Sequence, residues 1–247
     1  MLKRFGGNWG IWCLYHLIVA DAMAVQRPTK YKAVREFLGD SLGVAADIGC
    51  GPGVFIRYMS ARAQHVIAAD IDRDCLDRVR SRHRNVRNVE FIVTSADVLP
   101  FSDEHLDTIL LLEVLEHLVD DKAAVREMSR VLRPGGRLVL SVPVPPGEVN
   151  HDSAWGHKRE GYKLPEIVSL LTTNGFEVEK HSFAEFKFSR RAAQAIRWWR
   201  EVIRLPAPIV LAWIAYLDHF LVSSKTQTGS QLPATVVVLA RKRLKAI

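Results

Sequence analysis

One short segment of this chain, Asp47-Ile-Gly49-Cys-Gly51-Pro-Gly53, has the composition of a ligand-binding loop. It follows an apolar run, and its three glycines allow a tight turn that leaves room for a ligand against the backbone. A dinucleotide-binding loop of the form G-x-G-x-x-G would need glycine at position 54, where this sequence has Val54. The carboxylate of Asp47 would also repel a pyrophosphate. The loop therefore favours a ligand that carries positive charge.

Short apolar segments alternate with charged segments of helical period on both sides of this loop. Their hydrophobicity is continuous rather than alternating, which indicates strands covered on both faces. The succession of strand and helix then predicts a doubly wound α/β fold with a parallel sheet. The predicted strands are 44–48, 65–70, 89–93, 107–112, 137–142, 176–181 and 234–241. The predicted helices are 54–63, 73–82, 122–132 and 164–173.

The loop and four later segments resemble, in order and spacing, the motifs of class I S-adenosylmethionine-dependent methyltransferases. The later segments are Asp70, Thr94–Val98, Asp107–Leu118 with its Glu-Val-Leu-Glu-His sequence, and Val131–Val139, interpreted as the turn into the fifth strand. The resemblance runs from about residue 31 to 181 and resumes at 234–242. It implies a seven-stranded, mostly parallel sheet and S-adenosylmethionine as the cofactor.

The resemblance also implies roles for single residues. Asp47 with Gly49, Gly51 and Gly53 would shape the cofactor loop, Asp70, followed by Ile71, would accept hydrogen bonds from the ribose, and Asp97 with Val98 would contact the adenine. Glu113, at the end of the fourth predicted strand, is expected near the methyl group. Both Asp70 and Asp97 end adjacent strands, where open α/β sheets bind ligands, and this placement favours the cofactor role over that of simple turn formers. For Glu116 two interpretations stay open: a residue of the site, or a solvated residue of the following helix.

Methyl transfer from a sulfonium needs alignment, a dry pocket and, for a hydroxyl acceptor, a base. His151 and His157 are the predicted bases, because an imidazole titrates near neutral pH, although either could be a surface or packing residue. His117 is interpreted as a residue that shapes the pocket. The three cysteines have no regular spacing, so no metal site is predicted.

The methyl acceptor is predicted to be small or lipid-like. Nucleic acid is disfavoured because the Asn/Asp-Pro-Pro-Tyr/Phe signature of amino-directed methyltransferases is absent after the fourth strand. Residues 190–222 combine arginines, tryptophans and an apolar run, which is typical either of a lid over the acceptor or of a helix at a membrane surface. Two other functions stay open: a non-catalytic cofactor-binding or assembly module, and a nicotinamide-dependent oxidoreductase, against which Val54 argues.

Length and composition indicate one large α/β domain with additions. The chain has 247 residues, of which 48% are hydrophobic and 25% charged, and these values exclude global disorder. We expect a helical N-terminal cap over 1–43, the cofactor-binding core over 44–183, a helical insertion or lid over 184–232, and a final strand with a basic tail over 233–247. The apolar run 205–217 is shorter than the roughly 20 residues that span a bilayer. A cytoplasmic protein, with peripheral membrane contact as an open addition, is therefore expected.

Overall fold

The computed structural model describes residues 28–145, 156–186 and 233–244. The chain divides into two compact units, one made of residues 32–184 and 233–247 and the other of residues 1–31 and 185–232. The described residues belong almost wholly to the first unit. The predicted boundaries at residues 43, 183 and 232 stay a prediction.

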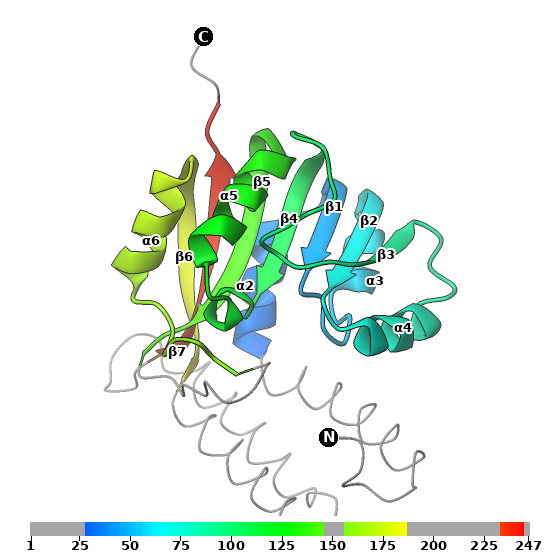
Figure 1. Ribbon diagram of the computed structural model, residues 1–247, viewed down its shortest axis with the longest axis horizontal. Helices are drawn as coiled ribbons and strands as arrows, with labels where there is room; N and C mark the ends of the chain where they lie inside the picture. The colour runs from blue at the N-terminus through cyan, green and yellow to red at the C-terminus, as the bar shows by residue number, and fades with distance from the viewer. Residues whose placement is uncertain (1–27, 146–155, 187–232, 245–247) are drawn as a thin grey trace, which may run out of the picture. The chain divides into compact units, whose positions relative to one another are not determined.

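A seven-stranded sheet forms the first unit, with the strand order β3-β2-β1-β4-β5-β7-β6 (Figure 1). The first five strands in the chain pair in parallel, and β7 runs antiparallel to β5, so that its arrow points the opposite way in Figure 1. This confirms the predicted α/β fold with a doubly wound, mostly parallel sheet. The strands are β1 (Gly43–Ile48), β2 (Ala63–Asp70), β3 (Val89–Val93), β4 (Leu106–Leu112), β5 (Leu132–Pro143), β6 (Phe176–Phe186) and β7 (Pro233–Lys242).

Two of the connecting helices begin at an aspartate whose side chain accepts a hydrogen bond from a backbone amide of the first turn. Asp72 accepts a hydrogen bond from Cys75 N at 3.0 Å, and Asp120 accepts one from Ala123 N at 2.8 Å. The helices are α2 (Pro28–Leu38), α3 (Ile56–Ser60), α4 (Arg73–Arg82), α5 (Asp121–Val131) and α6 (Leu164–Thr173), with a single 3₁₀ turn, η2 (Leu115–His117). Among these elements, no helix is long and apolar enough to cross a membrane.

Several elements differ from the prediction at their ends, and β6 ends at Phe186 rather than at residue 181. The helix predicted over 54–63 is only α3, because the chain still turns after Gly53, whose φ is +73°, and β2 already begins at Ala63. The strand predicted over 137–142 begins five residues earlier, directly after α5. The glycines interpreted as a turn therefore lie inside β5, where Gly135 has a φ of +77° and the pairing with β4 shifts register.

The middle of the sheet is covered on both faces. In β4, the successive side chains of Ile109, Leu110 and Leu111 are at most 1% exposed, although neighbouring residues of a strand point to opposite faces. This explains why the strands read as continuous apolar runs rather than alternating ones. The buried sheet is thus a rigid support for the loops and side chains at the ends of its strands.

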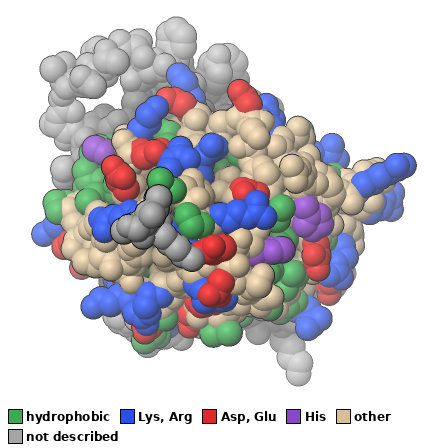
Figure 2. All heavy atoms as spheres, turned by 90° about the horizontal axis from the view of Figure 1, so that it is seen from above, with side chains coloured by type: hydrophobic (Ala, Val, Ile, Leu, Met, Phe, Trp, Pro, Cys, Tyr) green, Lys and Arg blue, Asp and Glu red, His purple; other side chains and the backbone are tan. Residues whose placement is uncertain are grey.

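Figure 2 looks at the end of the sheet where the parallel strands begin, and there basic and acidic side chains lie intermixed. Arg133 pairs with Asp107 at 2.8 Å, and Arg130 pairs with Asp103 at 2.9 Å. The positive charge of this face is therefore balanced locally, whereas a nucleic-acid surface needs a continuous basic patch.

Candidate active site

The glycine loop lies at the opposite end of the sheet, where β1 stops. The amides of Gly49 and Cys50 donate to Ala69 O at 2.8 and 3.0 Å, so the loop is held against the end of β2. Gly51 has a φ of +48°, and no atom of the described residues lies within 4 Å of the position that a Cβ would take. The backbone at Gly51 therefore borders open space that a ligand could fill.

Asp70, the last residue of β2, holds the loop in this shape. Its Oδ2 accepts a hydrogen bond from Gly51 N at 2.8 Å, and its Oδ1 accepts one from Asp72 N at 2.9 Å. Each carboxylate oxygen has a second lone pair, so both can still accept from a hydroxyl. Ile71 beside it is 57% exposed. The structure thus gives Asp70 a positioning role that the sequence did not predict.

Asp47, the predicted acidic residue of the loop, is only 4% exposed at the end of β1. Burial, and then the neighbouring charge of Asp70, raise the pKa of Asp47 from 3.8 to about 7. The negative charge of Asp70 disfavours ionisation of Asp47, and a cation bound beside Asp47 would favour it. The electrostatics of the loop therefore favour a positively charged ligand over an anionic one.

The end of β3 carries the predicted adenine-contacting pair. The hydroxyl of Ser95 donates to the carboxylate of Asp97, and Thr94 Oγ1 donates to Val98 O at 2.7 Å. These bonds fix a tight turn from which the side chain of Val98 is 69% exposed. Together with Ile71, at the end of the neighbouring strand, Val98 offers exposed apolar surface of the kind that a flat ring would cover.

Glu113, at the end of β4, has a φ of +53°, a conformation that is uncommon for any residue but glycine. Its amide donates to Ser141 O at 2.9 Å, and its Oε1 accepts from Ser141 Oγ at 2.8 Å. The chain then turns toward the glycine loop, where a Cβ on Gly49 would lie 2.4 Å from Val114 Cγ2. Only glycine at position 49 lets the two segments approach this closely.

The turn at Glu113 leads into η2 and brings Glu116 and His117 against His157. Glu116 is fully buried, and the rings of His117 and His157 meet edge to face with centroids 4.8 Å apart. One ligand atom from each of the three side chains lies within 4.8 Å of the other two. The structure therefore brings the predicted base His157 together with the histidine interpreted as a shaping residue. The other predicted base, His151, and the segment 190–222 lie outside the described residues.

The segment that carries His157 is fastened to the chain after β4 by residues that directly follow this histidine. Lys158 N donates to Glu116 O at 2.7 Å, and Arg159 Nη2 donates to Leu118 O at 2.9 Å. Tyr162 Oη donates to Asp121 Oδ2 at 2.8 Å, and Arg159 also pairs with this carboxylate. These contacts could not be predicted from the sequence, because their partners are about 40 residues apart and follow no spacing rule.

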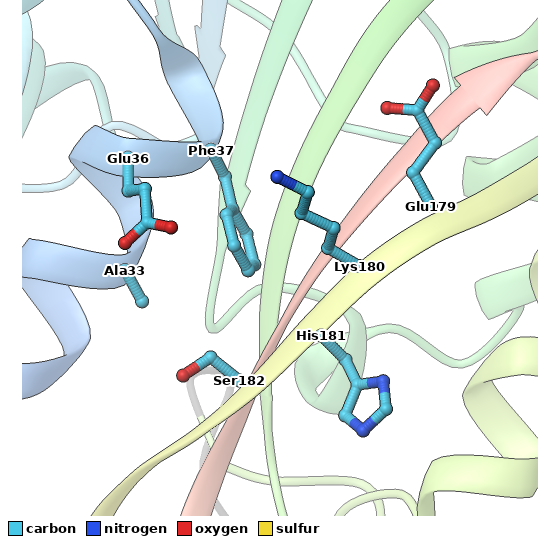
Figure 3. Close-up of a pocket in the computed structure, with 7 residues that line it drawn as sticks. All are labelled: Ala33, Glu36, Phe37, Glu179, Lys180, His181 and Ser182. Atoms are coloured by element: carbon cyan, nitrogen blue, oxygen red, sulfur yellow. The ribbon is translucent and has the colours of Figure 1, made fainter.

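A separate hollow of about 450 Å³ lies between α2 and the edge strand β6 (Figure 3). Its lining includes Glu36, Phe37 and Lys180, and the side chains of Phe37 and Lys180 point toward one another. None of the residues predicted to bind cofactor or acceptor lines it. The strand ends around the glycine loop therefore stay the candidate active site.

Comparison with known proteins finds a methyltransferase domain in this chain. Residues 46–140 match the family model described as a methyltransferase domain. The chain is 31% identical over 140 residues to a demethylmenaquinone methyltransferase of Clavibacter sepedonicus, an alignment that covers 54% of each chain. It is 37% identical over 143 residues to a ubiquinone/menaquinone biosynthesis C-methyltransferase of Shewanella frigidimarina, covering 56% of this chain and 55% of that one. The chain thus spans about half the length of the curated relatives it matches.

A solved structure shows the same fold. The 1,6-didemethyltoxoflavin-N1-methyltransferase of Burkholderia thailandensis, with bound S-adenosylhomocysteine, is 20% identical with a TM-score of 0.60, over 89% of this chain and 79% of that one. In the present chain, the open space at Gly51, the two acidic strand ends and the exposed side chains of Ile71 and Val98 suit a nucleoside that carries positive charge. Residues 46–140 of this chain therefore form a methyltransferase domain similar to the class I S-adenosylmethionine-dependent methyltransferases, with S-adenosylmethionine as its cofactor.

Proposed function

We propose that this protein methylates a small acceptor with an apolar part, of quinone-like or lipid-like character. The observation that carries the cofactor half of this proposal is the open space over Gly51, bordered by the carboxylates of Asp47 and Asp70. Two relatives named for demethylmenaquinone and for ubiquinone and menaquinone biosynthesis support the acceptor half. The arginines, tryptophans and apolar run of residues 190–222 support it as well.

In this proposal each strand end has its own task. Asp47 and Asp70 attract the positive charge of the cofactor, and Asp70 also accepts from the ribose hydroxyls. Ile71 and Val98 cover the faces of the adenine, and Asp97 accepts from its amino group. When bound, S-adenosylmethionine supplies an activated methyl group that moves by in-line displacement, so alignment and exclusion of water are what the protein contributes most.

Glu113 directly follows β4, and the next residue, Val114, lies against Gly49 of the glycine loop. Its left-handed backbone directs the following residues toward Gly49, and its bonds to Ser141 fix its side chain at the end of β4. We place it beside the methionine part of the cofactor. His157 was predicted as a general base, but it lies against His117 and beside Glu116.

The test is transfer of a labelled methyl group from S-adenosylmethionine to a panel of demethylated quinones and to fractionated lipid extract. We expect label in an apolar product, and its loss in the Asp70→Ala variant. Asp74→Asn is the matched control, because Asp74 is exposed on the first turn of α4 and should leave activity unchanged. Cofactor binding without label in any fraction would favour the non-catalytic alternative, and label only in nucleic acid would refute the proposed acceptor.

A further inference from the structure

The side chains of Glu116, His117 and His157 form a cluster that the methyl transfer proposed above does not use. We propose that this cluster binds a divalent transition-metal ion such as Zn²⁺. Among the residues that the structure describes, it is the one group of three histidine, cysteine or acidic side chains placed to hold an ion.

The chemistry of the three side chains suits such an ion. Two neutral imidazoles and one carboxylate are a common ligand set for zinc and for iron(II), whereas magnesium and calcium take oxygen ligands almost entirely. Three protein ligands also leave a coordination position for water or another oxygen. The two imidazole nitrogens and one carboxylate therefore favour a transition-metal ion over magnesium or calcium.

The distances require only small movements. Bonds from zinc to nitrogen and oxygen are about 2.0–2.2 Å, so two ligand atoms of one ion are at most about 4.4 Å apart. The three ligand atoms here lie within 4.8 Å of one another, and Nε2 of His117 is 4.0 Å from Oε1 of Glu116. Rotating the half-buried imidazoles inward by a few tenths of an ångström to about one ångström closes the site.

The cluster is partly buried and partly open to solvent. The carboxylate of Glu116 is fully buried. Nδ1 of His117 is buried and has no hydrogen-bond partner among the described residues. The side chain of His117 is nevertheless 33% exposed, which gives an ion a path into the cluster.

The surrounding structure holds the ligands in place before an ion binds. Lys158 N fastens the segment after His157 to Glu116 O, and Arg159 ties it to the chain after η2. Gly161 lets this segment approach β5, because a Cβ there would lie 2.2 Å from Pro143 O. Backbone fixed directly after His157 helps to hold this ligand in one position.

The test is titration of the chelator-treated full chain with Zn²⁺ by calorimetry and with Co²⁺ by visible absorption, without cofactor or acceptor. We expect one ion per chain. Glu116→Gln and His157→Gln should each weaken binding by at least about 100-fold, since even residues that only support ligands contribute roughly 10–100-fold. His105→Gln is the matched control, because His105 stacks on Phe101 away from the cluster and its loss should leave the affinity unchanged.

Each variant is also titrated with S-adenosylhomocysteine, which reports whether the cofactor crevice is folded. Wild-type protein that binds no Zn²⁺, or variants that bind it as tightly as wild type, would overturn the metal site and leave the proposed methyl transfer intact. Zinc binding without any S-adenosylhomocysteine binding would contradict only the proposed function. Unchanged S-adenosylhomocysteine affinity in these variants excludes misfolding as the cause of lost zinc.

Discussion

Replacing Asp47 by asparagine should stabilise the protein at alkaline pH while weakening its hold on the cofactor. The folded state keeps a proton on Asp47 up to a pKa of about 7, whereas the unfolded chain releases it near 3.8. Between these values the folded state binds more protons than the unfolded one, so stability falls as the pH rises and levels off above 7. The whole shift corresponds to about 4 kcal/mol of folding free energy.

The measurable part of this penalty lies between pH 5 and pH 8. Over that interval the ionisation of Asp47 should remove about 2–3 kcal/mol of stability from the wild type and none from Asp47→Asn. Urea unfolding of both proteins at the two pH values, followed by circular dichroism, measures the difference. The control is Asp40→Asn, since the side chain of Asp40 is 99% exposed and its loss should leave the pH dependence of the wild type unchanged.

The affinity for the cofactor should change in the opposite direction. A cation beside Asp47 favours the ionised carboxylate, so wild-type affinity for S-adenosylmethionine should rise about tenfold per pH unit below 7 and then level off. Asp47→Asn should bind weakly at every pH. If the variant shows the same pH dependence of stability as wild type, or binds the cofactor equally well at pH 8, the assignment of Asp47 as the buried, cation-binding carboxylate is refuted.

Three further changes test the rest of the site. Asp70→Ala removes the acceptor of two loop amides and should weaken S-adenosylhomocysteine binding by about 1.5–3 kcal/mol in calorimetry, so that unchanged affinity would contradict its role. Gly51→Ala should lower stability by only about 1–2 kcal/mol, which is the cost of an alanine in the left-handed backbone conformation of Gly51. It should reduce cofactor affinity at least about tenfold, because the new methyl group occupies the open space. Equal losses of stability and affinity would argue against a ligand in that space. Tyr162→Phe removes the hydroxyl that is hydrogen-bonded to Asp121 and should lower the free energy of unfolding in urea by about 1–2 kcal/mol. An unchanged free energy of unfolding would contradict a stabilising role of this hydrogen bond.

Local sequence patterns predicted the parts of the site that depend on neighbouring residues. The glycine loop, Asp70 and Asp97 each follow an apolar strand directly, so strand recognition alone brings them to one edge of the sheet. The bounds of α4 and α6 were predicted to the residue for the same reason, since their apolar spacing and their flanking turn residues are local.

The other half of the site depends on contacts that no spacing reveals. Glu116 was left open and His117 was not considered a ligand, because the approach of His157 depends on Arg159 and Tyr162 reaching a carboxylate about 40 residues earlier. The early start of β5 was missed for a similar reason, because pairing with β4 carries an irregular, glycine-containing stretch into the strand. Tertiary pairing outweighed local turn chemistry there.

The strand order has a consequence for how this protein is made. β7 lies between β5 and β6 but follows both in the chain, separated from β6 by the 46 residues between Phe186 and Pro233. At roughly 5–20 residues per second, a ribosome needs about 2–10 seconds to add that stretch. During this interval the strands that carry the cofactor site are already synthesised, but the edges of β5 and β6 that β7 will pair with are still unpaired. Pairing of these edges with other nascent chains then competes most strongly with completion of the sheet.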